Sequence, residues 1–174
     1  MGNPDTLLPM DGDEAHGSPR LRRSGRVHAT NEGDVMNPSC IFCEIVRGVA
    51  PAFKVYEDEH TLTFMDAFPV TDGHTLVVTK AHCTDLFDAS PPLLQAVMAT
   101  AKRVAHALRE VVRPDGLMVF QLNGAAAGQT VFHYHMHLMP RTSGEPLMLH
   151  SRSAGDPGRL RALATALSAA MPHA

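Results

Sequence analysis

Three histidines stand at every second position of one apolar stretch, and this pattern points more directly to chemistry than any other in the chain. Within residues 131–139, imidazoles occupy positions 133, 135 and 137, and large apolar side chains such as Phe132 fill the positions between them. A period of two predicts a β-strand with one histidine face and one core face. Because imidazole titrates near neutral pH, the histidine face is typical of a site that transfers protons, attacks an electrophile or binds a metal.

The spacing along a strand argues against a single metal held by all three histidines. Side chains at i and i+2 lie roughly 6.5–7 Å apart, and those at i and i+4 lie about 13 Å apart. Zinc requires each imidazole nitrogen at about 2.0–2.1 Å. We therefore expect one histidine to act as a nucleophile while its neighbours orient it or bind a separate ion.

A loop of small residues leads directly into the histidine strand. Residues 123–130 read Asn-Gly-Ala-Ala-Ala-Gly-Gln-Thr. Small side chains allow backbone N–H groups to approach a ligand closely, and concave arrays of such groups bind anions. A loop of this kind often only turns the chain, but its position beside three histidines favours an anion site to which Gln129 and Thr130 add side-chain donors.

Apolar periodicity and turn signals predict the elements that must position these residues. We expect a short helix at 41–46, strands at 53–56, 61–65, 74–78, 117–122 and 131–139, a long helix at 90–113 and a weaker helix at 157–170. Ser90 is the expected N-cap of the long helix, with Pro91 in its first turn, and the Pro-Asp-Gly sequence at 114–116 ends it.

The composition indicates one folded domain with an N-terminal extension. A chain of 174 residues is long enough to bury one core. Residues 1–37 contain few large hydrophobic side chains and are expected to be disordered. We expect the folded domain at 38–174, with its core at 39–142 and a C-terminal segment and helix at 143–174.

Charge and hydropathy argue against two classes of partner. The net charge of −3 gives no basic surface for nucleic acid, and no stretch reaches the roughly 18 apolar residues of a membrane span. The acidic N-terminus does not resemble a signal peptide, so we expect a cytoplasmic location. The histidines at 28, 60, 106, 150 and 173 are scattered along the chain and are expected to lie on the surface.

The three cysteines form a second candidate site. Cys40 and Cys43 make a C-x-x-C pair, and Cys83 is the third. In a cytosolic chain such a pair more often binds a metal or does redox chemistry than forms a stable disulfide. A thioredoxin-like function would require a parallel βαβ frame, which the predicted order of elements does not supply.

Taken together, these motifs resemble the signature of the histidine triad (HIT) superfamily of nucleotide hydrolases and transferases. The resemblance covers about residues 39–142. The matching segments are Ile41-Phe42, Phe64-Met65-Asp66, Gly73–Val78, Lys80-x-His82, Asn123-Gly124, Gly128-Gln129-Thr130 and His133–Met139. The resemblance implies an α+β fold, in which a five-stranded antiparallel sheet carries a long helix and shorter flanking helices, and it also implies a homodimer.

The resemblance also implies a role for each matching residue. His135 is the expected nucleophile, which attacks the α-phosphate of a nucleotide and forms a covalent nucleotidyl-histidine. His137, Gln129 and Thr130 are expected to stabilise charge on the phosphate oxygens, and Asp66 to bind the ribose hydroxyls. The remaining nucleotide-binding residues are Ile41, Phe42, Ile45, Phe64, Ala67, Asn123 and Gly128, of which the apolar ones could equally be core.

The zinc-bearing branch of the superfamily uses the C-x-x-C pair with two histidines, here His82 and His133. This resemblance implies a closed Cys₂His₂ site, in which zinc has a structural role. Such a zinc ion would hold the strand that presents the nucleophile. His74 and Cys83 are the alternative ligands, and a pair of buried thiols without metal is the simplest alternative.

We therefore expect a hydrolase or nucleotidyl transferase that acts on a purine ribonucleotide derivative. A phosphoramidate, an adenylylated species and a dinucleoside polyphosphate remain open as substrates, because no motif identifies the leaving group or the base. The alternatives are a regulatory nucleotide-binding module with incidental catalysis and a zinc-dependent redox or metal-handling protein.

Overall fold

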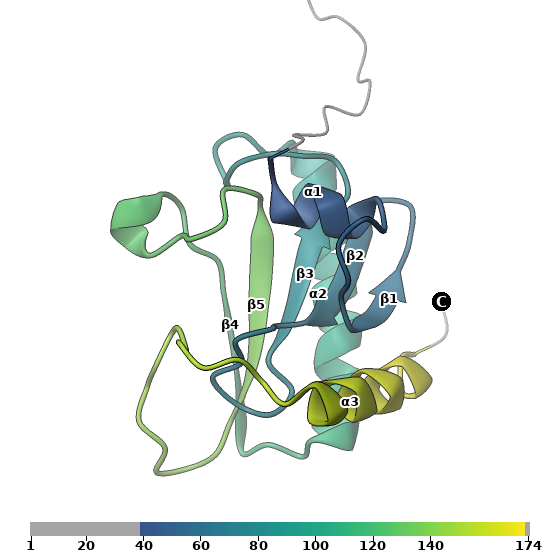
Figure 1. Ribbon diagram of the computed structural model, residues 1–174, viewed down its shortest axis with the longest axis vertical. Helices are drawn as coiled ribbons and strands as arrows, with labels where there is room; N and C mark the ends of the chain where they lie inside the picture. The colour runs from purple at the N-terminus through teal and green to yellow at the C-terminus, as the bar shows by residue number, and fades with distance from the viewer. Residues whose placement is uncertain (1–38, 173–174) are drawn as a thin grey trace, which may run out of the picture. The chain divides into compact units, whose positions relative to one another are not determined.

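A computed structural model describes residues 39–172, which fold around one five-stranded antiparallel sheet (Figure 1). The strands are β1 (Lys54–Glu57), β2 (Thr61–Met65), β3 (Thr75–Thr79), β4 (Gly116–Phe120) and β5 (His135–Arg141), in the spatial order β1-β2-β3-β5-β4. The helices are α1 (Ile41–Val46), α2 (Pro91–Val111) and α3 (Pro157–Ala169), with one 3₁₀ turn, η1 (Ala125–Ala127). The predicted fold class is confirmed. The extension that was predicted to be disordered lies outside the described residues, and so do His28 within it and His173.

The two faces of the sheet bury different sets of side chains. On one face, Val77, Met136 and Leu138 join the apolar cluster that includes α2 and α3. Figure 1 shows α2 behind the sheet and α1 in front of it. On the α1 face, Leu76 and Val78 pack with the side chains of α1. The central strand β3 is buried at every position because both of its faces are covered.

Strand register places the histidines of β5 on the α1 face. Leu76 is paired with His137, and Val78 is paired with His135. Side chains directly opposite each other on paired strands point to the same face. Both imidazoles therefore project toward α1, while Met136 between them enters the core on the other face.

The histidine strand begins later than the sequence predicts. The expected strand 131–139 starts only at His135, and residues 131–134 form a bend. The reason is that the ladder with β4 ends at the pair Phe120–His137, so this segment has no strand on that side. Tyr134 N–H instead donates to Cys83 O at 2.7 Å. Phe132, expected to lie in the core, is 50% exposed.

The other predicted elements agree with the structure to within one or two residues at most of their ends. Ser90 occupies the N-cap position of α2, although its side chain makes no capping hydrogen bond. Asp156 caps α3 by accepting from Arg159 N–H at 2.7 Å. Within residues 39–172, no helix combines the length and the apolar character that crossing a membrane requires.

Candidate active site and metal cluster

His135 is held in one tautomer by the backbone. Its Nδ1 lies 2.6 Å from His133 O, and because a carbonyl oxygen can only accept, Nδ1 must carry the hydrogen. The lone pair is therefore on Nε2, which is the nitrogen available for attack. Burial lowers the pKa of His135 below its usual value, against the opposing effect of the hydrogen bond to His133. Burial therefore favours the neutral imidazole, and the hydrogen bond to His133 fixes its tautomer and orientation.

An aromatic wall from α1 fixes the position of this ring. The Phe42 ring meets His135 edge-to-face, with a centroid separation of 5.1 Å. Phe64, from β2, lies 5.5 Å from Phe42 in the same type of contact. These rings exclude water from one side of His135 and form an apolar surface beside it.

His137 belongs to a hydrogen-bonded pair with His74. His137 Nδ1 lies 3.0 Å from His74 Nε2, and the Phe120 ring stacks on His137 with a centroid separation of 4.5 Å. Val70 N–H donates to His74 Nδ1 at 3.3 Å, so His74 donates through Nε2 and the hydrogen of His137 is on Nε2. Asp66 Oδ2 lies 3.5 Å from His74 Nδ1, but both atoms are acceptors in this tautomer, so no hydrogen bond joins them.

The pair stays neutral because it is buried. Burial lowers the pKa of His137 to about 2, and the neighbouring histidines His135, His74 and His150 add to the effect. Burial also lowers the pKa of His74, with Asp66 opposing it. His137 Nε2 is buried and has no hydrogen-bond partner among the described residues. A buried N–H without a partner is costly, so this donor is suited to a ligand oxygen.

His74 was considered from the sequence only as an alternative metal ligand. It lies in the Gly73–Val78 segment that matches the superfamily, but the sequence gives no signal that its ring meets His137. The facing ring nitrogens of His74 and His137 are joined to each other, and Asp66, His74 and His137 have ligand atoms within 4.8 Å of one another. We interpret this group as a hydrogen-bonded network that fixes His137.

The loop before β5 is held by the Gln129 side chain. Its Oε1 accepts from Gly124 N–H at 2.7 Å, and its Nε2 donates to Thr84 O at 2.7 Å and Val131 O at 3.1 Å. Both amide hydrogens are used, so in this conformation the Gln129 side chain has no donor left for a phosphate oxygen. Its role in the structure is to shape the loop that leads to Thr130.

A cavity of ≈ 960 Å³ lies on the α1 face of the sheet. It brings together most residues that the sequence assigned to nucleotide binding and catalysis. These are Ile41, Phe42, Ile45, Phe64, Asp66, Ala67, Thr130, His135 and His137. This volume is at the upper end of the about 300–1,000 Å³ typical of small-molecule sites.

Three predicted residues do not line this cavity. Asn123 Oδ1 accepts from Leu86 N–H at 2.8 Å, and Gln129 is bonded within the loop as described. Gly128 ends the η1 turn with φ of 95°, a conformation that favours glycine. Residues 50–53, Phe68, His150–Arg152 and Arg161 line the cavity without having been predicted to do so.

The cysteine pair lies beside two histidines at the junction of α1, β3 and the bend before β5. The ligand atoms of Cys40, Cys43, His82 and His133 lie within 4.8 Å of one another. His133 Nε2 donates to Thr79 O at 2.7 Å, which leaves Nδ1 unprotonated and directed at the cysteines. Burial lowers the pKa of His133 to about 4, so the ring is in the neutral form that a metal requires.

The separations within this cluster match a tetrahedral zinc site. With Zn–S of about 2.3 Å and Zn–N of about 2.0–2.1 Å, tetrahedral ligands lie about 3.6 Å apart for sulfur to nitrogen and about 3.3 Å apart for nitrogen to nitrogen. Sγ lies 3.4 Å from His133 Nδ1 for Cys40, and 3.3 Å and 3.6 Å from the Nδ1 atoms of His82 and His133 for Cys43. The two Nδ1 atoms of His82 and His133 are 3.3 Å apart. The four side chains therefore have the composition and geometry of a structural zinc site.

The alternative ligands lie outside this cluster. Cys83 Sγ is buried 3.6 Å from Thr79 Oγ1, and burial raises the pKa of its thiol. His74 is paired with His137. The fold and the site define a class of small α+β proteins that have a buried imidazole of fixed tautomer in an apolar cavity, next to a Cys₂His₂ cluster.

The chain belongs to the HIT domain family, whose model matches residues 47–144. An uncharacterized HIT-like protein of Mycoplasma genitalium is 48% identical over 103 residues, which cover 59% of this chain and 73% of its own. The adenylylsulfatase HINT3 of Arabidopsis thaliana is 34% identical over 110 residues, which cover 63% of this chain and 56% of its own.

Solved structures agree with this assignment. A zinc-bound histidine triad family protein from Mycobacterium smegmatis superposes with a TM-score of 0.68 at 43% identity, covering 76% of this chain and 92% of its own. The HIT family includes nucleotide-binding proteins and nucleotide hydrolases. The predicted superfamily and its zinc-bearing branch are confirmed.

Proposed function

We propose that the chain transfers the nucleotidyl group of a purine ribonucleotide derivative to His135 and then to water. The observation that supports this most directly is the hydrogen bond from His135 Nδ1 to His133 O, which leaves the Nε2 lone pair in the cavity. A neutral imidazole of fixed tautomer is a competent nucleophile and also a competent leaving group.

The reaction has two balanced steps. His135 Nε2 donates its electron pair to the α-phosphorus, and the bond from phosphorus to the leaving group breaks with its electrons on the departing atom. A water oxygen then bonds to phosphorus, the phosphorus–nitrogen bond breaks, and its electron pair returns to Nε2. That nitrogen can take up the proton which the water loses.

The surrounding donors suit the charge that develops on the phosphate. His137 Nε2–H is buried without a partner among the described residues, which supports a role in binding a non-bridging oxygen. Thr130 lines the cavity and is exposed, so its hydroxyl can bind a second oxygen. Preorganised donors of this kind need no reorganisation as the charge forms.

The rest of the cavity suits a nucleoside. Ile41, Phe42 and Phe64 form an apolar surface of the kind that a planar base occupies. Asp66 lines the same cavity, and its Oδ1 accepts from Phe68 N–H at 2.9 Å. Oδ2 lies near His74 but makes no short hydrogen bond there, so it can accept from a ribose hydroxyl.

Zinc is the metal that suits Cys40, Cys43, His82 and His133. When bound there, it supplies structural stability and no chemistry at the substrate. The cluster fixes the position of His133, whose carbonyl oxygen in turn orients His135. Thiolate ligands require a reducing environment, so we also propose a cytoplasmic location.

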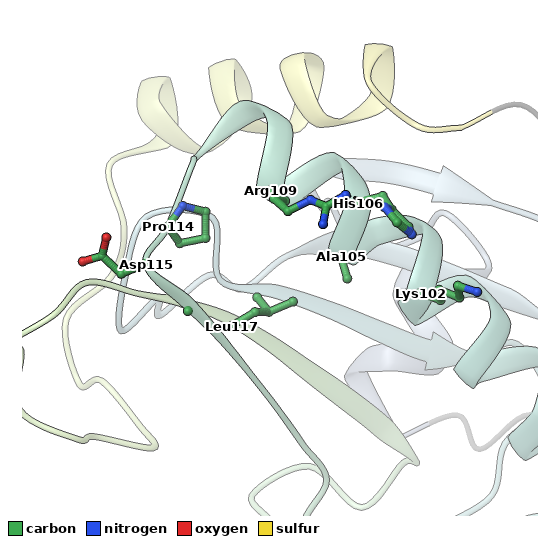
Figure 2. A pocket seen from close by; sticks show the side chains of 8 residues that line it. Lys102, Ala105, His106, Arg109, Pro114, Asp115 and Leu117 are labelled. Carbon is green, nitrogen blue, oxygen red and sulfur yellow. Dashed lines mark hydrogen bonds between the residues drawn. The ribbon is translucent and has the colours of Figure 1, made fainter.

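A homodimer is the assembly that we propose. Strand β4 lies at one edge of the sheet, and its residue Val119 is 44% exposed. Figure 2 shows the adjoining hollow of ≈ 330 Å³, with Lys102, His106 and Arg109 of α2 on one side and Leu117 of β4 on the other. An edge strand with unpaired backbone groups is suited to pairing with a second copy.

A covalent intermediate would test the proposed chemistry. Wild-type protein is mixed with an α-³²P-labelled adenosine or guanosine substrate and quenched in denaturant. We expect label on the protein with wild type and with His60→Ala, a control at an exposed histidine between β1 and β2, and none with His135→Ala. Nucleotide binding without label or turnover would instead support a regulatory module. Activity that requires Cys40 but not His135 would support a redox or metal-handling protein.

A further inference from the structure

Residues beyond the matched family domain contribute to the cavity. The family model ends at residue 144, whereas His150, Ser151 and Arg152 line the cavity together with Arg161 of α3. His150 was expected from the sequence to be an unremarkable surface residue. Its exposed ring instead lies at the active site, so the C-terminal segment adds groups to the site that the family resemblance does not provide.

His150 lies on the phosphate side of the cavity. Its ring centroid is 6.4 Å from that of His137. A Cβ atom placed on Gly128 would meet His150 Nε2 at 3.3 Å, so this ring also lies against the loop that precedes Thr130. His150 therefore lies near His137 and near the loop that leads to Thr130.

Contacts at its C-terminal end hold this segment in place. Gly155 N–H donates to Ala67 O at 2.9 Å. A Cβ atom at Gly155 would meet Pro69 at 2.9 Å, so the backbone passes close to the loop after β2. Two residues upstream, Ser153 N–H donates to Ser151 Oγ at 3.1 Å. The segment reaches the cavity from a fixed point next to Asp66.

The added groups change the charge of the cavity. Among the described residues, the cavity is lined by one carboxylate, that of Asp66, and by two guanidinium groups, those of Arg152 and Arg161. Within residues 39–172, neither guanidinium forms an ion pair with a carboxylate. Arg161 lies 5.7 Å above the Phe53 ring. Cations left without an acidic partner beside a site attract anions and repel amines.

We infer that His150 and Arg152 bind the leaving group of the substrate, and that this leaving group is an oxygen-linked anion of the phosphate or sulfate type. The inference rests on the proposed function. In the first step the bond from the α-phosphorus to the bridging oxygen breaks, and its electrons stay on that oxygen, which departs as a phosphate, a longer polyphosphate or a sulfate. The His150 and Arg152 donors stabilise the charge it gains, and no further proton is required.

The test compares substrates that share one adenosine 5′-phosphoryl group. Adenosine 5′-phosphosulfate and diadenosine triphosphate have anionic leaving groups, and adenosine 5′-phosphoramidate has an amine. The kcat/KM of each is measured for wild type, His150→Ala, Arg152→Ala and His60→Ala, whose exposed histidine lies in the turn between β1 and β2.

We expect wild type to have a higher kcat/KM for substrates with an anionic leaving group than for the phosphoramidate. His150→Ala and Arg152→Ala should each reduce this ratio about 10- to 100-fold, because each loses one hydrogen bond to a charged group. His60→Ala should retain the wild-type ratio. A larger loss with the sulfate or with the triphosphate identifies which anion fits. Equal losses on all three substrates, or no loss, would overturn the inference.

These outcomes are distinct from a failure of the proposed function. If wild type turns over none of the three substrates, or if turnover survives in His135→Ala, the nucleophilic mechanism itself is wrong. If turnover depends on His135 but the ratio is insensitive to His150 and Arg152, the mechanism stands and the assignment of the leaving group is wrong.

Discussion

At the scale of single residues, the site depends on keeping buried histidines neutral. His135 and His137 are 5% and 4% exposed, and each has a nitrogen that must act as an electron-pair donor or a hydrogen donor at neutral pH. The same burial that lowers their pKa values also makes protonation unfavourable in the folded state. Folding and the proposed chemistry therefore depend on the same protonation state.

His137 should make the stability of the protein depend on pH. Its pKa falls from the ordinary 6.5 to about 2 because the ring is buried. Below about pH 6.5 the unfolded chain binds a proton there and the folded chain does not, so stability present above pH 6.5 is lost as the pH falls. The expected loss is about 1.4 kcal/mol per pH unit for this one group.

Urea unfolding from pH 6.5 to 5.0 would measure this effect. In His137→Gln the free energy of unfolding should fall less steeply than in wild type, by about 1.4 kcal/mol per pH unit. Both proteins contain the metal cluster, so any release of metal at acid pH affects them equally. Identical slopes for the two proteins would show that His137 does not stay neutral in the folded state.

At the scale of elements, the metal cluster joins three segments that share little regular structure. Cys40 and Cys43 come from the start of α1, His82 follows β3, and His133 lies in the bend before β5. The bend lacks a strand partner on the β4 side, and the hydrogen bond from Tyr134 N–H to Cys83 O ties it to the segment after β3. A bound ion is an effective way to hold such a segment.

Zinc should therefore stabilise the fold and order the bend. With free zinc at 100 times its dissociation constant, the expected gain is about 2.7 kcal/mol. Cys43→Ser should lose the bound zinc and this gain, and its amide hydrogens at residues 131–135 should exchange faster. Cys83→Ser, a buried cysteine outside the cluster, is the matched control and should retain stoichiometric zinc. Zinc retention by Cys43→Ser would refute the ligand assignment.

At the scale of the whole molecule, the exposed edge of β4 predicts self-association. A homodimer would have about twice the mass of the 18.8 kDa chain in sedimentation equilibrium. A lysine on an edge strand opposes pairing with another strand. We expect Val119→Lys to shift the protein to the monomer, while Val49→Lys, at a position 69% exposed near α1, leaves the dimer intact. A wild-type monomer at micromolar concentration would contradict this assembly.

The sequence predicted the fold well because its signals are local. Periodicity and turn residues identified the helices α1, α2 and α3 and the five strands of the described residues, but not the turn η1. The resemblance to the HIT superfamily identified the four residues of the metal cluster. What the sequence could not provide depends on contacts between distant segments. The pairing of His74 with His137 spans 63 residues, and His150 reaches the cavity through a segment without a motif. The start of β5 also differs from the prediction, because β4 ends at Phe120 and leaves the segment before β5 without a partner on that side.

The ring of His133 and its backbone oxygen contact different parts of the site. Its ring nitrogens face Thr79 and the cysteine cluster, while its backbone oxygen accepts from His135, the proposed nucleophile. An alanine survey of the triad would therefore rank this position among those essential for turnover, although the ring that is removed never meets the substrate. Loss of rate alone would therefore overstate how many histidines contact the substrate. Zinc content measured on the same sample would separate a structural role from a catalytic one.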